Sequence, residues 1–538
     1  MAVHQENSTY IIGSENTSKL SQAISSIICE QSTMVPPVLS VRHSKPKLVV
    51  PCKPTPGGKK QLSHIDQQGY LRSQMPMLLF YPAGKETNSN VGRVIKEALG
   101  KALVYYYPWA GRMMESDDGN LVVDCTGEGV LFVEAEADIT LAEMAGNKGF
   151  LAPPFPCVDD LLYDVPEAFD IIDSPLLLFQ VTRLACGGFV LGFRMNHTMT
   201  DGVGIIQFLN AIAEIARGAS RPSVMPVWRR HILCFLDLPC VISTDLLESE
   251  SNLTQLTIDP NEDEDDNNDK RGINIHRTFF FGHDELSIIR QRLQPCMRST
   301  CTTFELLAAF LWRSRIIALR LHSLQHPTSQ EYITREHGKV QPVRTLMLAF
   351  VSHTLIRLYR FTRIQVWLFD SVNVINGRVS GELFEYVSLM FVVNVRPRFD
   401  LPDGYYGNAI ILAAAVSQAG KVTSSLDHAV ELVKRGKEKV TMEFIRSVSL
   451  RPGPAPANFQ FTDANSWVIS DNKPFKFLDI DFGWGKPVYG GPASDLVDEQ
   501  PIPVSYFING MDDKGRSGLL VPVCLPDASM DRCEIYTT

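Results

Sequence analysis

The sequence predicts an α/β protein. Runs with the alternating pattern of β-strands take turns with runs whose apolar residues recur every three or four positions, as on one face of a helix. Of the 538 residues, 45% are hydrophobic and 21% are charged, which is typical of a globular protein and excludes collagen, a coiled coil and a wholly disordered chain. The length suits about three or four ordinary domains, or one enzyme made of two fused lobes.

A polar leader, residues 1–33, opens the chain, and we expect it to be disordered. The first predicted lobe then spans residues 34–221. A helix is expected over residues 91–103, because its apolar positions fall at helical spacing behind Ser89 and Asn90, two residue types that cap helices.

A hairpin and a second helix follow in the first lobe. Residues 176–184 and 189–196 are two β-rich runs, and the glycines between them permit a tight turn. Apolar residues then repeat at three and four positions over residues 205–215, which predicts a helix. Residues 197–202 therefore lie in the turn between a strand and a helix.

A crossover linker is predicted over residues 222–271, which show no sustained period and include an acidic run at residues 261–266. These carboxylates repel one another and lack the glycine-centred spacing of a calcium loop, so a solvated linker is favoured over a metal site. The second lobe spans residues 272–538 and begins with the strand-like residues 277–281.

Within the second lobe, Thr302 and Glu305 have the spacing of a capping box and predict a helix with a buried apolar face. The apolar residues within 322–388 match neither the spacing of a helix nor the alternation of a strand. We interpret them as an atypical insertion rather than as a basic amphipathic membrane helix. Regular sequence resumes near residue 391, and the small residues at 409–419 predict another helix.

Charge and cysteine content exclude several classes of function. The formal charge is −9, so we expect no nucleic-acid partner. The eleven cysteines are scattered without a C-x-x-C pair, which favours reduced thiols over disulfides or a zinc site. There is neither a signal peptide nor an apolar stretch of the roughly 18 residues that span a bilayer, so we expect a cytoplasmic protein without a membrane partner.

His197 is the candidate catalytic base. It lies four residues before Asp201 in the turn between the predicted strand and helix, where its ring can project into a cleft. With an ordinary pKa near 6.5, a neutral imidazole can take a proton from a hydroxyl group and return it to a leaving group. Asp201 falls at the start of the helix, where its carboxylate can cap backbone amides or pair with a buried arginine.

Two other interpretations of this H-x-x-x-D pair remain open at this point. The two side chains can both bind a metal, but no third ligand has suitable spacing, so we expect none. His197 can equally have a structural role, since so short a motif occurs by chance.

Residues 481–485, which read D-F-G-W-G, supply the missing context. Together with H-x-x-x-D, the run Y-Y-Y-P-W-A-G-R at 105–112 and Y-Y-G-N at 405–408, they resemble the plant BAHD acyltransferases. The resemblance covers most of residues 34–321 and 389–526. Four segments look most like the alcohol acyltransferases, in particular the benzyl alcohol O-benzoyltransferases: residues 48–56, 61–66, 127–130 and 486–492.

The resemblance implies two similar α/β lobes of the chloramphenicol-acetyltransferase type, with mixed sheets flanked by helices and a central channel between them. It implies that His197 deprotonates the acceptor, which attacks the thioester directly, and that Asp201 gives structural support. The implied reaction moves an acyl group, benzoyl or acetyl, from coenzyme A to an alcohol such as benzyl alcohol. Acyl-CoA is then a co-substrate, and no bound cofactor is expected.

The D-F-G-W-G segment is a structural motif in this family, so Asp481, Phe482, Gly483 and Gly485 are expected to shape a loop. Trp484 is a candidate oxyanion contact through its indole N–H. The sequence does not identify the residues that bind coenzyme A.

Three functional hypotheses follow. The first is an active, monomeric alcohol acyltransferase. The second is a catalytically impaired or ligand-binding relative whose second lobe is disrupted by the insertion. The third is an N-acyltransferase with an amine acceptor. One departure from the family is that residues 472–474 read N-K-P where relatives commonly carry Thr-Arg, which leaves the partner of Asp481 open.

Overall fold

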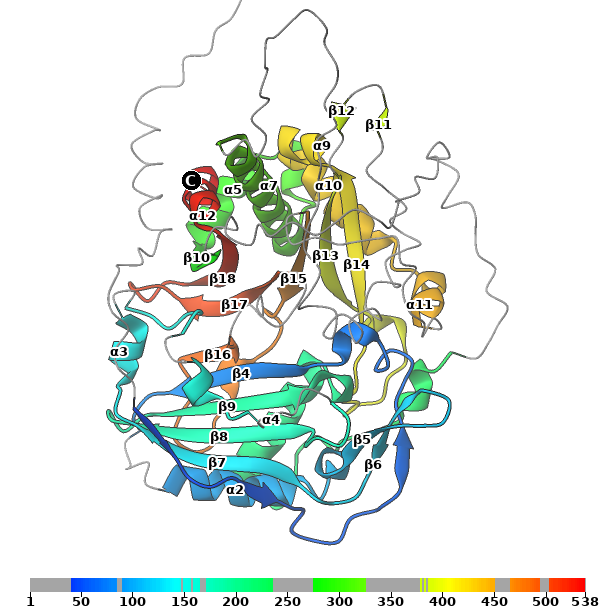
Figure 1. Ribbon diagram of the computed structural model, residues 1–538, viewed down its shortest axis with the longest axis vertical. Coiled ribbons are helices and arrows are strands. Elements are labelled where there is room, and N and C mark those ends of the chain that lie inside the picture. The colour runs from blue at the N-terminus through cyan, green and yellow to red at the C-terminus, as the bar shows by residue number, and fades with distance from the viewer. Residues whose placement is uncertain are drawn as a thin grey trace, which may run out of the picture.

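The computed structural model describes residues 40–84, 90–146, 149–155, 158–164, 171–235, 274–325, 378–379, 382–383, 386–449, 465–493 and 503–537. These residues form two lobes, each a mixed β-sheet with helices packed on it (Figure 1). The predicted α/β class with two similar lobes is confirmed. The leader, residues 1–33, and the acidic run, residues 261–266, lie outside the described residues.

The first lobe is built on a seven-stranded sheet. Its strands run in the order β1 (Val41–His43), β7 (Val130–Ala137), β8 (Leu177–Leu184), β9 (Phe189–Asn196), β4 (Gln74–Tyr81) and β16 (Tyr489–Pro492), and β2 (Lys47–Val49) also pairs with β7. Because β16 pairs antiparallel with β4, a strand from the sequence of the second lobe completes the sheet of the first. The predicted lobe boundary is therefore crossed by the chain again near its C-terminal end.

Two helices, α2 (Val91–Ala102) and α4 (Gly202–Ala216), pack against each other and against this sheet, as their apolar periods predicted. The β8–β9 hairpin is also confirmed, with Gly187 at φ 82° in its turn. A smaller sheet with the strand order β3 (Lys59–Gln61), β6 (Leu121–Asp124) and β5 (Arg112–Glu115) also belongs to this lobe. The short helix α3 (Leu141–Ala145) completes it.

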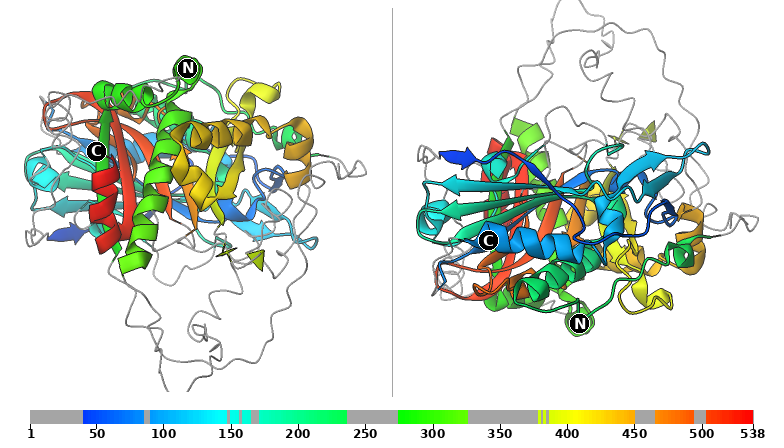
Figure 2. Two further views of the ribbon diagram at one scale, coloured as in Figure 1. Left: turned by 90° about the horizontal axis from the view of Figure 1, so that it is seen from above. Right: turned by 90° about the horizontal axis from the view of Figure 1, so that it is seen from below.

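The second lobe has a six-stranded sheet in the order β10 (Asn274–Gly282), β18 (Ser517–Pro526), β17 (Val504–Met511), β15 (Ser466–Asp471), β13 (Tyr386–Asn394) and β14 (Ile410–Gln418). Seen from above, helix α7 (Thr303–Gln325) lies between α12 (Asp527–Thr537) and α10 (Leu426–Glu438) over the strands (Figure 2). The shorter helices are α5 (His283–Gln291), α6 (Pro295–Arg298), α9 (Ala419–Ser424) and α11 (Met442–Ser449).

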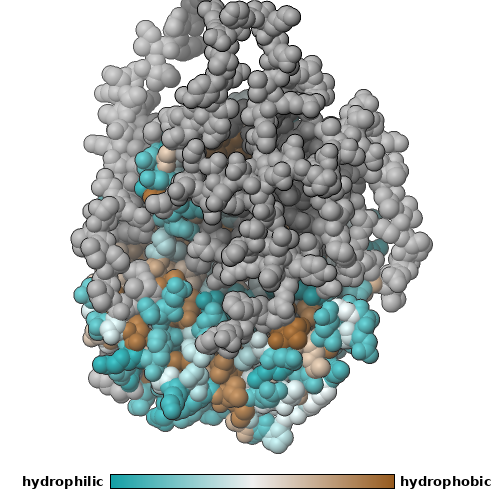
Figure 3. Space-filling view, in the orientation of Figure 1, coloured by the Kyte–Doolittle hydropathy of each residue, from teal (hydrophilic) through white to brown (hydrophobic). Residues whose placement is uncertain are grey.

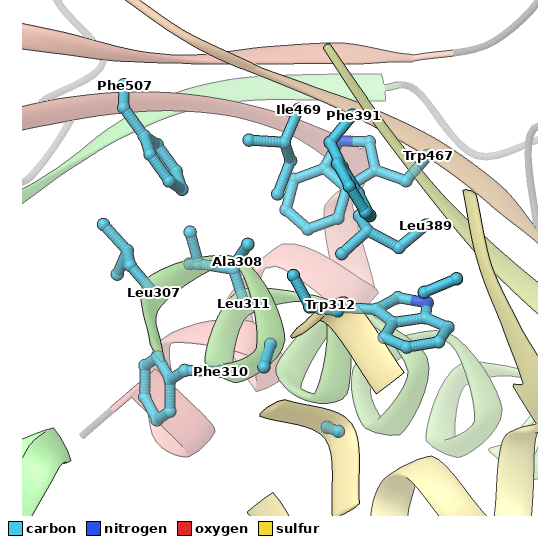
Figure 4. Packing of buried hydrophobic residues seen from close by; sticks show 14 of the residues in the cluster. Leu307, Ala308, Phe310, Leu311, Trp312, Leu389, Phe391, Trp467, Ile469 and Phe507 are labelled. Atoms are coloured by element: carbon cyan, nitrogen blue, oxygen red, sulfur yellow. The ribbon is translucent and has the colours of Figure 1, made fainter. Parts of the chain in front are cut away.

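The core of the second lobe lies between α7 and the sheet. Trp312 and Leu311 of α7 face Phe391 of β13 and Trp467 of β15, and all four are at most 2% exposed (Figure 4). Thr302 and Glu305 form the predicted capping box at the start of this helix, with the Thr302 N–H donating to Glu305 Oε2 at 2.9 Å.

The small residues at 409–419 form strand β14 instead of the predicted helix. All nine residues of the strand pair antiparallel with β13. Small side chains are needed here because α10 packs closely on the strand: a Cβ on Gly436 would lie 3.0 Å from the Ala414 carbonyl oxygen. Tertiary pairing thus overrides the helix propensity of alanine.

The predicted insertion, residues 322–388, carries regular structure at both ends. Helix α7 continues to Gln325, strands β11 (Arg378–Val379) and β12 (Glu382–Leu383) pair with each other, and β13 begins at Tyr386. Residues 326–377 lie outside the described part of the chain. Residue 322 therefore lies within α7 and residue 388 within β13, so both ends of the predicted segment belong to elements of the second lobe.

The two lobes meet through the outer face of the first sheet. Leu78 and Phe80 of β4 point away from α2 and α4 and pack in one buried cluster with Tyr489, Ile508 and Leu520. On the face shown in Figure 3, hydrophobic residues of the first lobe are interspersed with hydrophilic ones. In the described part of the chain, no helix is both long and apolar enough to cross a membrane.

Candidate active site

His197 begins the short 3₁₀ turn η6 (His197–Met199), which connects β9 to α4. Asn196, the last residue of β9, caps this turn through its side chain, whose Oδ1 accepts from the Thr198 N–H at 3.1 Å and the Thr198 hydroxyl at 2.6 Å. The His197 N–H donates to the Ser73 carbonyl at 2.9 Å. The predicted strand-to-helix turn therefore exists, and its backbone is fixed to the segment before β4.

The imidazole of His197 is closely surrounded by protein atoms but keeps part of its surface exposed. Its Nδ1 atom is buried, which leaves Nε2 as the nitrogen at the accessible surface. Burial lowers the pKa of His197 below 6.5, although the carbonyls of His197 and Thr200, the Asp201 carboxylate and the Asn408 side chain act in the opposite direction. The ring is therefore neutral at pH 7, the form a general base requires.

This pKa shift predicts the pH dependence of activity. Because only the neutral imidazole accepts a proton, kcat/KM should rise with pH along a limb whose midpoint lies below 6.5 and should be flat from about pH 7 upward. Initial rates measured from acid to mildly alkaline pH at low acceptor concentration give this limb. A midpoint above 6.5 would contradict the desolvated position of the ring.

Asp201 caps α4 and faces the second lobe. Its Oδ1 accepts from the N–H groups of Val203 and Gly204 at 3.1 and 3.3 Å. The Arg396 guanidinium donates to both carboxylate oxygens at 2.6 and 2.8 Å, and the Ala409 N–H donates to Oδ2 at 2.9 Å. Both uses foreseen for this side chain, helix cap and partner of an arginine, are present at once, and the carboxylate makes these contacts away from the imidazole.

Gly204 is required by the close approach of the two lobes at this turn. A Cβ at this position would lie 2.1 Å from the Thr200 hydroxyl oxygen and 2.2 Å from the Tyr406 carbonyl oxygen. The Thr200 hydroxyl donates to that same carbonyl at 2.6 Å, so the carbonyl has little room to move.

We predict that Gly204→Ala lowers the free energy of unfolding by about 1–3 kcal/mol, because the added methyl group overpacks this contact. Gly420→Ala is the matched control: apart from its chain neighbours and the backbone of its own helix, no heavy atom lies within 4 Å of the place its methyl group would take, so the change should be neutral or stabilising by up to about 1 kcal/mol. Denaturant unfolding of both variants checks the prediction, and equal effects would contradict it.

Asp66 is a buried hub behind the turn and is 0% exposed. Its Oδ1 accepts from Arg230 Nη1 at 2.8 Å and from the N–H and Nδ2 of Asn408 at 3.0 and 2.9 Å. Its Oδ2 accepts from the Ser63 N–H and hydroxyl at 2.9 and 2.7 Å. One carboxylate thus joins the first lobe, the crossover segment and the second lobe.

The groups bound to Asp66 also hold the backbone of the His197 turn. Asn408 Nδ2 donates to the carbonyls of His197 and Thr198 at 2.9 and 3.2 Å. Arg230 Nη2 donates to the carbonyl of Met199 at 2.7 Å. Every carbonyl of η6 therefore accepts from a donor that is itself bound to Asp66.

Arg230 shows that the described part of the predicted linker, residues 222–235, is not wholly solvated. It lies in the turn η7 (Arg230–Leu233), is 1% exposed, and stacks 4.4 Å from the ring centroid of Trp228. Sequence periodicity missed it because its partner Asp66 is 164 residues away. In the sequence, Asp66 and Asn408 could be singled out only because they belong to segments that resemble the BAHD family.

The D-F-G-W-G segment forms a tight loop closed by Asp481. The Oδ1 of Asp481 accepts from the N–H groups of Gly483 and Gly485 at 2.7 and 2.9 Å, and both glycines have φ of 100° or more. The Asp481 carbonyl accepts from Arg217. Backbone amides of its own loop are therefore the partners of this carboxylate. Phe482 packs edge-on against Tyr81, which anchors the loop to the first sheet.

Trp484 lies far from His197. Its ring packs edge-on on Phe189, the first residue of β9, with centroids 6.1 Å apart. His197 follows the last residue of the same strand, and eight residues of strand at about 3.3 Å each separate the two positions by roughly 25 Å. The structure does not bring Trp484 and His197 together, so this arrangement does not support an oxyanion contact from Trp484.

The described residues contain no group of three or more His, Cys, Asp or Glu side chains that could hold a metal ion. A cavity of about 440 Å³ lined by Arg42, Glu136 and Arg183 lies at the hairpin end of β8 and β9, away from His197. The candidate site therefore consists of one partly accessible imidazole on a turn whose backbone is hydrogen-bonded to residues of both lobes.

Known proteins with similar sequences are acyltransferases by name. Benzyl alcohol O-benzoyltransferase of Nicotiana tabacum is 40% identical over 506 residues, which cover 92% of either chain. Alcohol acyl transferase 1 allele GSd of Malus domestica is 38% identical over 514 residues, covering 93% of this chain and 94% of that one.

Solved structures show the same fold. Vinorine synthase has a TM-score of 0.57 at 17% identity and covers 92% of this chain and 96% of its own. TRI101 of F. sporotrichioides, crystallised with coenzyme A and T-2, has a TM-score of 0.58 at 14% identity, covering 89% and 97%.

The model of the Transferase family matches residues 39–337 and 378–535. Together with relatives at about 40% identity over nearly the whole chain, this match confirms the resemblance seen in the motifs. The chain is an acyltransferase that belongs to the Transferase family, the BAHD acyltransferases.

Proposed function

We propose that this enzyme moves an acyl group, benzoyl or acetyl, from coenzyme A to a small alcohol such as benzyl alcohol. The observation that carries the proposal is His197: a neutral imidazole, accessible at Nε2, on a turn held by residues of both lobes. The relatives named for alcohol acylation, and a structural relative crystallised with coenzyme A, support the choice of substrates.

The proposed mechanism needs one base and good positioning. Nε2 of His197 takes the proton of the acceptor hydroxyl, the alcohol oxygen attacks the thioester carbonyl, and the tetrahedral intermediate expels the thiolate of coenzyme A. The thiolate then takes up the proton held by Nε2. The turn lies where α4 meets the second lobe, and in this proposal both substrates reach Nε2 between the lobes. No metal or bound cofactor takes part.

The test is an assay of the purified full-length chain with a panel of acyl-CoA thioesters and acceptors. Thiol release measures turnover, and mass spectrometry identifies the product. Benzoyl-CoA and acetyl-CoA are paired with benzyl alcohol, a short aliphatic alcohol and benzylamine. Ester formation supports the proposal, amide formation with benzylamine alone supports the N-acyltransferase alternative, and thioester hydrolysis without transfer contradicts both.

The alternative of a catalytically impaired relative depends on the inserted segment. The family model passes over residues 338–377, so a variant without these residues keeps α7 and β13 intact. If only this shortened chain folds and turns over, the segment impairs the natural enzyme. Equal activity of both chains removes that alternative.

We further propose that the enzyme acts as a monomer in the cytoplasm. The cysteines of the described segments are free thiols, and Asn196, which begins an N-glycosylation sequon, is 0% exposed beside the base. Size-exclusion chromatography with light scattering and imaging of a tagged chain in cells test the two parts of this proposal.

A further inference from the structure

Arg230 and Asp66 form a buried ion pair whose presence is not explained by stability alone. Their side chains are 1% and 0% exposed, and burying two opposite charges gains little over two apolar side chains of similar size. Burial alone would lower the pKa of Arg230, but Asp66, Tyr405 and Tyr406 more than offset this effect, so the guanidinium stays charged.

The geometry of Arg230 is determined from several sides. Nη1 binds Asp66, Nη2 binds the Met199 carbonyl, and the guanidinium plane lies against Trp228. A Cβ on Gly407 would lie 2.1 Å from Nη1, so the second lobe also leaves room only for a glycine there. The arginine therefore cannot shift without moving one of these groups.

The Met199 carbonyl is the far end of the His197 turn. Met199 is 0% exposed, so without Arg230 its carbonyl would be left in an apolar environment with a lost hydrogen bond. The turn would have to rearrange to satisfy it, and the imidazole two residues earlier would move with it. A displacement of about 1 Å at a reacting group can lower a rate about 100-fold.

We propose that Arg230, held by Asp66, is a positioning residue for acyl transfer: it fixes the Met199 carbonyl and thereby the place of the His197 imidazole. The inference rests on the proposed function. It adds a role for a residue of the crossover segment, which touches neither substrate nor base.

Lysine separates this role from a contribution to stability alone. Arg230→Lys keeps the positive charge beside Asp66, but a single ammonium group cannot reproduce the fork that binds Asp66 and the Met199 carbonyl together. The ion pair with Asp66 should survive, while the hydrogen bond to the Met199 carbonyl is lost.

A matched control exists in the other lobe. Arg315 is 5% exposed, donates to the Cys524 carbonyl at 3.0 Å and stacks 5.6 Å from the ring centroid of Trp467. Arg315→Lys therefore removes a similar buried contact far from His197. Both variants are assayed well below the lower of their two melting temperatures.

We expect Arg230→Lys to lower kcat by about 10–100-fold with KM for both substrates within threefold, and Arg315→Lys to leave kcat within twofold. Asp66→Asn is the second variant and should show the same selective loss of kcat, so the proposal stays testable if Arg230→Lys does not fold. Equal kcat values for the two lysine variants, or a loss confined to KM, would overturn it.

A readout without substrate separates this inference from the proposed function. In NMR titrations the His197 signal is identified by its absence in His197→Gln. Loosening the turn admits water and weakens the desolvation that lowers the His197 pKa, so in Arg230→Lys this pKa should rise toward 6.5, and in Arg315→Lys it should not change. An unchanged pKa in a folded Arg230→Lys overturns the positioning role even if the acyl-CoA panel finds no activity at all.

Discussion

His197→Ala is expected to lower kcat by about 10²–10⁴-fold, the range that general acid–base catalysis contributes. Alanine removes Nε2, the nitrogen that faces accessible space, and leaves the backbone of the turn with its hydrogen bonds to Ser73, Asn408 and Arg230. Binding of acyl-CoA should change little, because the substitution removes no charge at pH 7. The loss should therefore appear in kcat rather than in KM for the thioester.

The control for this prediction is His283→Ala. The side chain of His283 is 95% exposed at the start of α5, so its removal should leave kcat within twofold. Circular dichroism of both variants shows whether the fold is kept. A folded His197→Ala enzyme that retains wild-type turnover would refute His197 as the base, and with it the proposed mechanism.

Local signals in the sequence were sufficient to place His197 in the turn between β9 and α4. The apolar periods around residues 91–103 and 205–215, the glycines of the hairpin and the short turn at residue 197 act over a few positions, and the elements formed as predicted. Asp201 illustrates the limit. The hydrogen bonds by which it caps Val203 and Gly204 are local, and a cap was predicted. Its partner Arg396 is 195 residues away, and the spacing of apolar residues in the sequence does not indicate which arginine pairs with Asp201.

Contacts between distant segments account for the errors. The composition of residues 409–419 predicts a helix, but nine antiparallel residue pairs with β13 make them a strand. Arg230 reads as part of a polar linker until Asp66 and Trp228 surround it. Trp484 was placed near the base by its motif alone, because no sequence feature shows that its loop packs at the opposite end of β9.

The ion pair between the lobes leads to the second large effect, on stability. Asp201→Ala should lower the free energy of unfolding by about 3 kcal/mol, the lower end of the cost of removing one partner of a buried charged pair, because Asp201 is 2% exposed but Arg396 is 17% exposed. The change removes the cap of α4 and both hydrogen bonds from Arg396 together with that from Ala409. Denaturant unfolding followed by tryptophan fluorescence measures the loss.

Two further variants separate charge from cap. Glu97 forms an exposed pair with Arg93 on α2, and Glu97→Ala should change stability by no more than about 0.5 kcal/mol. In the double variant Asp201→Ala/Arg396→Met, the uncompensated guanidinium is gone, so part of the lost stability should return. The cap of α4 stays missing, which sets the remaining deficit at about 1 kcal/mol or more. If the double variant is no more stable than Asp201→Ala, the unpaired guanidinium carries no penalty, and the stability lost in Asp201→Ala comes from the cap of α4 and the Ala409 contact.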